Sequence, residues 1–339
     1  MMKELGITIP AIADRYGLRG GRVVSIVLAL ILFTVPLWGN PYLVSIFINI
    51  GLYSIIALGL VLLTGLAGQV SLGQAVFYGI GAYTSALLAL RFGVPPGFGV
   101  VVAGTVAGLV AVPIGRAIFR LRGIIVAGVT LTVNLIFFYL VVSISDLTGG
   151  ATGLVLIPRF EYPSIMRYST FVFFLVWMTA VVCLILALNL ARSRVGRALK
   201  SVNILAGGSE DTAQVLGVDV MHFKTGAYVV AAVFAGVAGA VYAHYVTVIE
   251  PHTFSAQTSV VVAIMVIVGG VTSPWGAVLG AGLIVGITEV LREVAPVVLG
   301  GSTGAYELVA YGAVLILTLL FLPEGLFSLP ARIGRRREN

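Results

Sequence analysis

The chain has 339 residues, of which 59% are hydrophobic and only 10% are charged. A water-soluble domain carries about 25% charged residues, so the composition excludes a soluble enzyme and predicts a polytopic membrane protein. The formal net charge of +7 would suit nucleic acid in a soluble protein, but here the arginines flank apolar runs. We interpret them as orientation signals and contacts to membrane lipid, and we expect no nucleic-acid partner.

Hydropathy predicts an all-α fold with about ten transmembrane helices. The predicted spans are residues 23–38, 43–64, 75–90, 98–118, 124–142, 169–190, 226–247, 254–271, 275–291 and 305–322. We expect the first span to be retained rather than cleaved as a signal peptide. The predicted parts are a cytoplasmic N-terminal segment (1–22), a transmembrane domain (23–322) and a basic cytoplasmic tail (323–339).

Clusters of Lys and Arg predict the orientation. They occur at 15–22, 116–122, 192–200 and 332–337, and ten crossings place all of them on one side. Because cytoplasmic loops are enriched in Lys and Arg, that side is the inside. The spans at 23–38 and 75–90 are short for a bilayer core of about 30 Å, so a re-entrant segment could replace one pair of crossings.

Two glycine-rich breaks interrupt the apolar runs on the predicted inner side. The first is GLAGQVSLGQ (65–74), within a run without charge from residue 43 to 90, and the second is GGVTSPWG (269–276). Irregular backbone cannot face lipid, so it must be buried in protein, line a watery cavity or reach the membrane surface. Such breaks indicate a transport pathway between repeats, with an ordinary tight turn as the alternative.

Neutral residues, rather than charged ones, dominate the predicted pathway. Between the second and fifth spans no ionisable group lies away from a span end, which argues against proton or sodium coupling. Glu289, Arg292, Glu293 and Glu307 lie near span ends, where they can reach the interface. Each pathway candidate has helix packing as its alternative role. The candidates are Gly65, Gly68, Gln69, Ser71, Gly73, Gln74, Tyr78, Tyr83, Thr130, Asn134, Gly269 and Gly270.

The inner loop at 191–225 carries the pattern of a short capped helix. A serine stands at the N-cap position, acidic residues fill the first turn and a glycine can end the helix. We predict that this helix receives force from a soluble ATPase, although a plain connecting loop could look alike. The predicted coupling residues are Ser209, Glu210, Asp211, Thr212, Ala213, Leu216 and Gly217.

The outer loop at 143–164 is rich in turn-forming glycine and proline. It is either a plain connector or a docking surface for an external partner. No phosphate-binding loop, nucleophile elbow or metal-ligand spacing occurs in the sequence. We therefore expect no enzyme activity, cofactor or metal in this chain, and any ATP hydrolysis would belong to partner subunits.

Six segments, in order, resemble the permease subunits of branched-chain amino acid ABC importers. The resemblance extends from about residue 43 to 323 and is closer to the M-type than to the H-type permease. The segments are 58–88 (LGLVLLTGLAGQVSLGQAVFYGIGAYTSALL), 120–131 (RLRGIIVAGVTL), 147–154 (LTGGATGL), 193–201 (SRVGRALKS), 235–254 (AGVAGAVYAHYVTVIEPHTF) and 268–281 (VGGVTSPWGAVLGA).

The resemblance implies an ABC importer permease fold in the inner membrane of a prokaryote. It implies a heterodimer with a second permease, two cytoplasmic ATPase subunits and a periplasmic or lipid-anchored binding protein. It also implies that Thr212, Ala213 and Gly217 stand at the family's coupling motif, although the preceding SVNILAGGSED (201–211) is longer and poorer in charge than the family pattern. The family includes importers of urea and short amides, so the solute stays open. The remaining alternatives are an ion-coupled secondary transporter and a non-transporting membrane scaffold.

Overall fold

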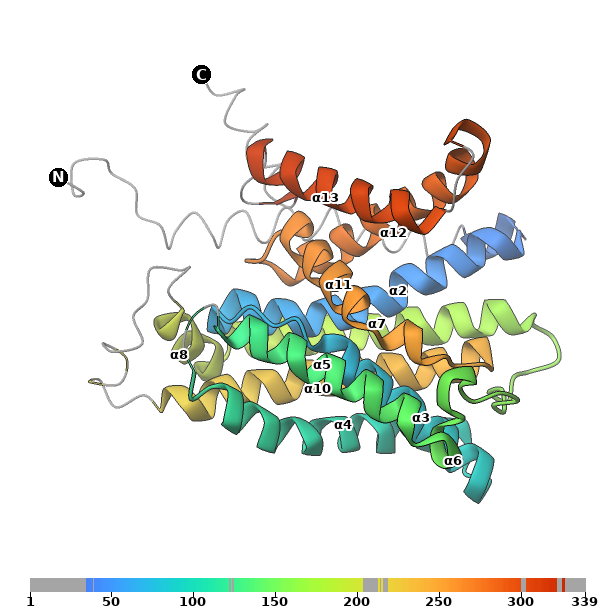
Figure 1. Cartoon of the computed structure of the whole chain (residues 1–339), viewed down its shortest axis with the longest axis horizontal. Coiled ribbons are helices and arrows are strands. Elements are labelled where there is room, and N and C mark those ends of the chain that lie inside the picture. The colour runs from blue at the N-terminus through green and yellow to red at the C-terminus, as the bar shows by residue number, and fades with distance from the viewer. Residues whose placement is uncertain are drawn as a thin grey trace.

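The computed structural model describes residues 35–38, 40–121, 123, 125–203, 213, 215, 219–299, 303–321, 325 and 326. In this part the chain is helical (Figure 1), with one isolated antiparallel bridge between Leu154 and Ile249. The elements are η1 (Val35–Trp38), α2 (Pro41–Val61) with its π-helical extension η2 (Leu62–Leu66), α3 (Gln74–Phe92), α4 (Pro96–Ile118), α5 (Ile125–Ser143), α6 (Ser145–Thr148), η3 (Gly150–Thr152), α7 (Tyr168–Arg192), α8 (Arg194–Val202), α10 (Val220–Val246), η5 (Pro251–Phe254), α11 (Ala256–Gly269), α12 (Pro274–Leu299) and α13 (Thr303–Phe321).

The predicted all-α polytopic fold is confirmed. Within the described residues, seven helices are long and apolar enough to cross a membrane, and α11 and residues 309–318 of α13 are shorter apolar segments. Nine of the ten predicted spans coincide with described helices. Apart from Val35–Trp38, the predicted first span (23–38) lies outside the described residues, as do the segment 1–22 and most of the tail. The number of ten crossings therefore stays a prediction.

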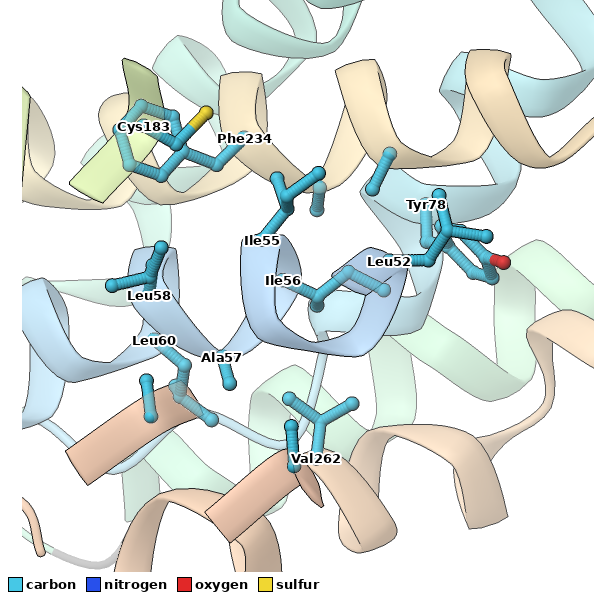
Figure 2. Close-up of a cluster of buried hydrophobic side chains, with 14 of the residues drawn as sticks. Leu52, Ile55, Ile56, Ala57, Leu58, Leu60, Tyr78, Cys183, Phe234 and Val262 are labelled. Atoms are coloured by element: carbon cyan, nitrogen blue, oxygen red, sulfur yellow. The ribbon is translucent and has the colours of Figure 1, made fainter. Parts of the chain in front are cut away.

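Helix α2 is the centre of the bundle. In its 18-residue apolar window 78% of the residues are buried, against 33% in α4 and 28% in α5. Figure 2 shows why, because Ile55 and Leu58 of α2 point toward Phe234 of α10 and Cys183 of α7, while Ala57 lies on the opposite side, toward Val262 of α11. A helix that is apolar all round must be buried on all sides or face lipid. Here α2 is buried by protein, whereas the described residues leave the outer faces of α4 and α5 largely uncovered.

Small residues allow the helices around α10 to approach closely. A Cβ added at Gly81 of α3 would overlap the backbone of Gly236 in α10, and one at Gly239 would overlap the carbonyl of Tyr78. At the contact with α4, a Cβ on Gly104 would lie 2.9 Å from Val237. Lipid tails supply no hydrophobic drive between helices, so such close backbone packing is a main source of attraction in membranes.

The two ends of the bundle differ in charge. The end that carries α8, at the left of Figure 1, holds Arg116 and Arg120 as well as the basic residues of Arg194–Val202. The opposite end holds the acidic Glu289 and Glu307. An excess of Lys and Arg marks the cytoplasmic side, so we refer to the α8 end as the inner end and to the opposite end as the outer end.

Candidate functional site: an outer cavity and an inner closure

A cavity of about 480 Å³ opens into the outer half of the bundle. We refer to it as the outer cavity. Its walls come from α2, α3, α10, the segment from η5 into α11, α12 and α13, so segments from both ends of the sequence surround it. Helix α2 contributes Asn49, Leu52 and Tyr53, while α3 contributes Tyr78 alone. Cavities of this kind between bundle helices are the usual places for small ligands.

Three charged side chains form a cluster at the outer end of this cavity. Arg292 Nη1 lies 3.4 Å from Glu289 Oε1 on the same helix, and Arg292 Nε lies 3.3 Å from Glu307 Oε1 on α13. The hydroxyl of Tyr42 donates a 3.0 Å hydrogen bond to Glu289 Oε2. We refer to Glu289, Arg292 and Glu307 as the outer charge cluster. It holds the outer ends of α2, α12 and α13 together.

Apolar side chains line the deeper part of the cavity. Helix α11 enters from the outer side, so Thr258 is followed one and two turns deeper by Val261 and Met265. Helix α12 runs the other way, so Val285 lies one turn deeper than Glu289. The cavity therefore changes from charged at its mouth to apolar at its floor.

The first glycine break turns back into the bundle instead of lying on the membrane surface. Phe77 of α3 packs edge-to-face on Tyr228 of α10, and Gly81 of α3 meets Gly236 of the same helix. These contacts place the start of α3 about nine residues, or roughly 14 Å, further from the inner end than the start of α10. Gln74, the first residue of α3, is completely buried. The predicted third span thus begins inside the protein rather than at the inner end.

A buried serine holds this internal helix start. Ser259 Oγ of α11 accepts hydrogen bonds from the backbone N–H of Ala75, at 2.9 Å, and from Asn134 Nδ2 of α5, at 2.7 Å. Beside it, Thr130 Oγ1 accepts from the backbone N–H of Leu72 at 2.9 Å. The backbone donors of a helix start need partners when water is absent. Helices α5 and α11 supply them.

Several buried polar atoms near this start have no hydrogen-bond partner among the described residues. They are both amide atoms of Gln74, the Oδ1 of Asn134 and the hydroxyl of Tyr83. Unpaired polar groups in a buried site are costly, so each calls for a reason. Gln74 and Asn134 lie at the internal helix start itself, and Tyr83 lies about two and a half turns further along α3.

The two glycine breaks meet at the inner end. A Cβ added at Gly65 would overlap the carbonyl oxygen of Val271, which belongs to the second break. Gly269 packs in the same way on the carbonyl of Gly276, and Gly325 packs on Gly270. We refer to this group of backbone contacts as the inner closure. Only glycine permits backbones to approach this closely.

Asn203 connects the inner closure to the inner loop. It follows α8 directly, it is 2% exposed, and its Nδ2 donates a 2.8 Å hydrogen bond to the carbonyl of Gly65. Gly68, whose φ is +66°, lies so close that a Cβ there would overlap the Asn203 side chain. Sequence reasoning could not single out this residue, because one asparagine in a basic, polar loop looks like any other.

Most of the predicted coupling residues cannot be placed. Ser209, Glu210, Asp211, Thr212, Leu216 and Gly217 lie outside the described residues. Ala213 is described and is 2% exposed, packed in a small cluster with Val202 and Val220 of its own chain. Val215 is 87% exposed. Of the two residues described in this segment, Ala213 is therefore covered by its own chain, and Val215 presents its apolar side chain to a partner.

The outer loop is held firmly against α10. Leu154 and Ile249 exchange backbone hydrogen bonds of 3.0 and 2.9 Å. His244, fully buried, has Nδ1 2.7 Å from the carbonyl of Pro158 and Nε2 2.8 Å from Ser85 Oγ. The carbonyl can only accept, so Nδ1 carries the proton and Nε2 accepts from the serine. His244 of α10 is thus a structural residue that holds the outer loop in place. Sequence reasoning had established only that the histidines show no metal-ligand spacing.

The predicted pathway residues fall into two groups. Tyr78 lines the outer cavity. The others lie in the first break, at the internal start of α3 or in the inner closure, and Thr130 and Asn134 lie beside that start on α5. Tyr83 is the exception, because it packs on Phe254 further along α3. Sequence reasoning missed Ser259 and Asn203, and it assigned Glu289, Arg292 and Glu307 to the interface rather than to a cavity. No group of His, Cys, Asp and Glu that could hold a metal occurs within the described part of the chain.

Comparison with known proteins agrees with this architecture. Residues 42–319 match the family described as "Branched-chain amino acid transport system / permease component". The high-affinity branched-chain amino acid transport system permease protein LivM of Escherichia coli (strain K12) is 29% identical over 303 residues, which cover 82% of this chain and 68% of LivM. The high-affinity branched-chain amino acid transport system permease protein LivH of the same strain is 29% identical over 300 residues, which cover 82% of this chain and 92% of LivH. No solved structure matches the chain. The family match spans most of the sequence, and the chain therefore belongs to the permease components of branched-chain amino acid transport systems.

Proposed function

We propose that this chain forms part of the membrane passage of an ATP-driven importer for branched-chain amino acids or a similar small solute. In this proposal the solute arrives from an external binding protein, and a second permease subunit completes the passage. Two ATPase subunits on the inner side supply the energy. The curated relatives carry names of branched-chain amino acid permeases, which supports the solute class and a second permease as partner.

One observation carries the proposal: a cavity that opens on the outer side and ends before an inner closure made of two glycine breaks. A passage that is open on one side and closed on the other is what alternating access requires. The closure is made of backbone contacts and one asparagine, without ion pairs between its described residues. It can therefore separate without breaking strong electrostatic contacts.

The energy source is proposed to be external because the described spans offer no chain of ionisable groups across the membrane. The outer charge cluster lies near one end, and Lys224 lies in the first turns of α10 near the other. Proton and sodium carriers place ionisable residues along the pathway between these depths. Between them, this chain offers neutral groups such as Gln74 and Asn134.

The test is uptake of radiolabelled leucine into proteoliposomes that contain the complete complex, loaded with binding protein outside and ATP inside. We expect uptake that needs ATP and survives ionophores that collapse proton and sodium gradients. Uptake that persists without ATP and stops with the ionophores would instead identify an ion-coupled carrier. The matched control is a variant of the partner ATPase subunits whose phosphate-binding loop is inactivated, since it should abolish uptake without altering this chain.

A further inference from the structure

The outer charge cluster contains two carboxylates and one guanidinium, so it carries one negative charge in excess. Its ion-pair distances of 3.4 and 3.3 Å are longer than the usual 2.7–2.9 Å of charge-assisted hydrogen bonds. Tyr42 donates to Glu289 Oε2, but among the described residues Glu307 Oε2 accepts no hydrogen bond and Arg292 Nη2 donates none. The cluster thus keeps one free carboxylate oxygen and one free guanidinium nitrogen at the cavity mouth.

A polar group that the fold itself does not use lies further in. Tyr78 is 3% exposed and lines the outer cavity, yet its hydroxyl has no hydrogen-bond partner among the described residues. Its ring is fixed by T-shaped contact with Phe254, at 5.1 Å between centroids. The hydroxyl is not one of the buried unpaired atoms, so it opens on the cavity, where a ligand or water can bond to it.

The floor of the cavity offers the opposite chemistry. Leu52 of α2 lies there together with Val261 and Met265, which are one and two turns deeper along α11 than Thr258. An apolar group that enters this floor leaves water, which is favourable in proportion to its buried area. Charged groups, in contrast, enter a low-dielectric site only when they are paired.

We propose that the outer cavity binds the zwitterionic head group of an α-amino acid at Glu289, Arg292 and Glu307. The ammonium group pairs with the free oxygen of Glu307, the carboxylate pairs with the free donors of Arg292, and an apolar side chain occupies the floor. This inference rests on the proposed function and deepens it, because it assigns a solute subsite to this chain. The excess negative charge excludes a solute that carries only a carboxylate.

The hydroxyl of Tyr78, deeper than the cluster, then reaches the carboxylate of the bound solute through a water molecule. A neutral amide or urea would leave the charges of the cluster unanswered and would gain little from the apolar floor. An amine without a carboxylate would neutralise Glu307 but leave Arg292 with free donors. Of these solute classes, the zwitterion with an apolar side chain uses every part of the cavity.

The experiment is equilibrium binding of radiolabelled leucine to the complete complex in nanodiscs, without binding protein. The competitors are unlabelled leucine, 3-methylbutylamine, which lacks the carboxylate, and 4-methylpentanoate, which lacks the amine. We expect leucine to compete at least tenfold better than either analogue. Equal competition by the amine, effective competition by the acid, or no detectable leucine binding would each overturn the proposal.

Variants then locate the site. Glu307→Gln should weaken leucine binding at least tenfold, whereas Glu293→Gln, an exposed neighbour outside the cavity, should leave it unchanged. Because Glu307 also joins two helices, Tyr78→Phe provides a second variant that keeps packing and removes only the hydroxyl. The net worth of one hydrogen bond predicts a loss of about 2- to 10-fold for Tyr78→Phe.

The outcomes separate this inference from the proposed function. If the complex imports leucine with ATP but Glu307→Gln and Tyr78→Phe bind leucine like the wild type, the subsite is wrong and the importer stands. If leucine binds as expected but uptake follows an ion gradient instead of ATP, the importer is wrong and the subsite stands. Melting temperatures of the variants within the complex confirm that any loss of binding is not a loss of folding.

Discussion

The hydrogen bond from Asn203 to Gly65 provides the sharpest test of how the inner end is controlled. Asn203 stands between α8, which lies in the inner loop, and the first glycine break. Replacing it with alanine removes the donor and leaves the Gly65 carbonyl without it. We expect Asn203→Ala to loosen the connection between the inner loop and the inner closure, while the helices themselves stay folded.

The size of the effect follows from the bond. A single hydrogen bond contributes a net of about 0.5–1.5 kcal/mol, which changes an open–closed equilibrium by about 2- to 12-fold. The bond is partly buried, so water can replace some of the lost interaction and the larger desolvation penalty does not apply in full. Asn203→Asp should have a greater effect, because it replaces the donor with a negatively charged acceptor that repels the Gly65 carbonyl oxygen.

The assay is ATP hydrolysis by the reconstituted complex, with and without binding protein that carries leucine. We expect hydrolysis without solute to rise and the stimulation by loaded binding protein to fall, in the order wild type, Asn203→Ala, Asn203→Asp. Ser201→Ala is the matched control, since Ser201 is exposed and bonds only within α8, to the Ala198 carbonyl. Unchanged stimulation in both Asn203 variants would refute the connection.

Three further predictions test the packing around this pathway. Gly239→Val should lower the melting temperature of the purified chain, because it forces a side chain into backbone of α3 at a cost of about 1–3 kcal/mol, whereas Gly286→Val has open space around it and should not. Ser259→Ala should lower the melting temperature, because it removes the oxygen that accepts from both Ala75 N–H and Asn134 Nδ2. Ser259→Thr keeps this oxygen and should restore most of the lost melting temperature. Gly68→Ala should reduce leucine uptake strongly, while Gly93→Ala should not. Both glycines have positive φ, but only Gly68 has a neighbour in the way, so equal uptake by the two variants would show that the contact is unimportant.

The helices could be predicted from the sequence because the bilayer imposes a simple rule of length and polarity. Runs such as 43–64 have no other stable form in lipid than a helix. The same rule could not predict that α2 is central, because helices that face lipid and helices that face protein are equally apolar. Small residues four positions apart, such as Gly276 and Gly280, favour close helix packing, and both make close backbone contacts.

The meeting of the two breaks was beyond prediction for a different reason. Gly65 and Val271 are more than two hundred positions apart, and only the arrangement of the whole bundle brings them together. A single polar residue in a long apolar helix, such as Ser259, carries no local pattern either. The outer charge cluster was visible as residues near span ends, but the sequence did not show that α12 and α13 turn those side chains toward one cavity.

The outer cavity and the inner closure share helix α11, and this links events at the two ends. Val261 and Met265 lie on the cavity floor, and Gly269 ends the same helix within the inner closure. A helix of 14 residues, about 21 Å long, moves as one rigid piece. Helix α2 differs, because it passes into a π-helical segment, Leu62–Leu66, directly before the first break. Such segments mark places where a helix adapts locally. We therefore expect a solute that displaces the cavity floor to move α11 as a unit, and the inner end of α2 to bend at Leu62–Leu66 as the two breaks separate.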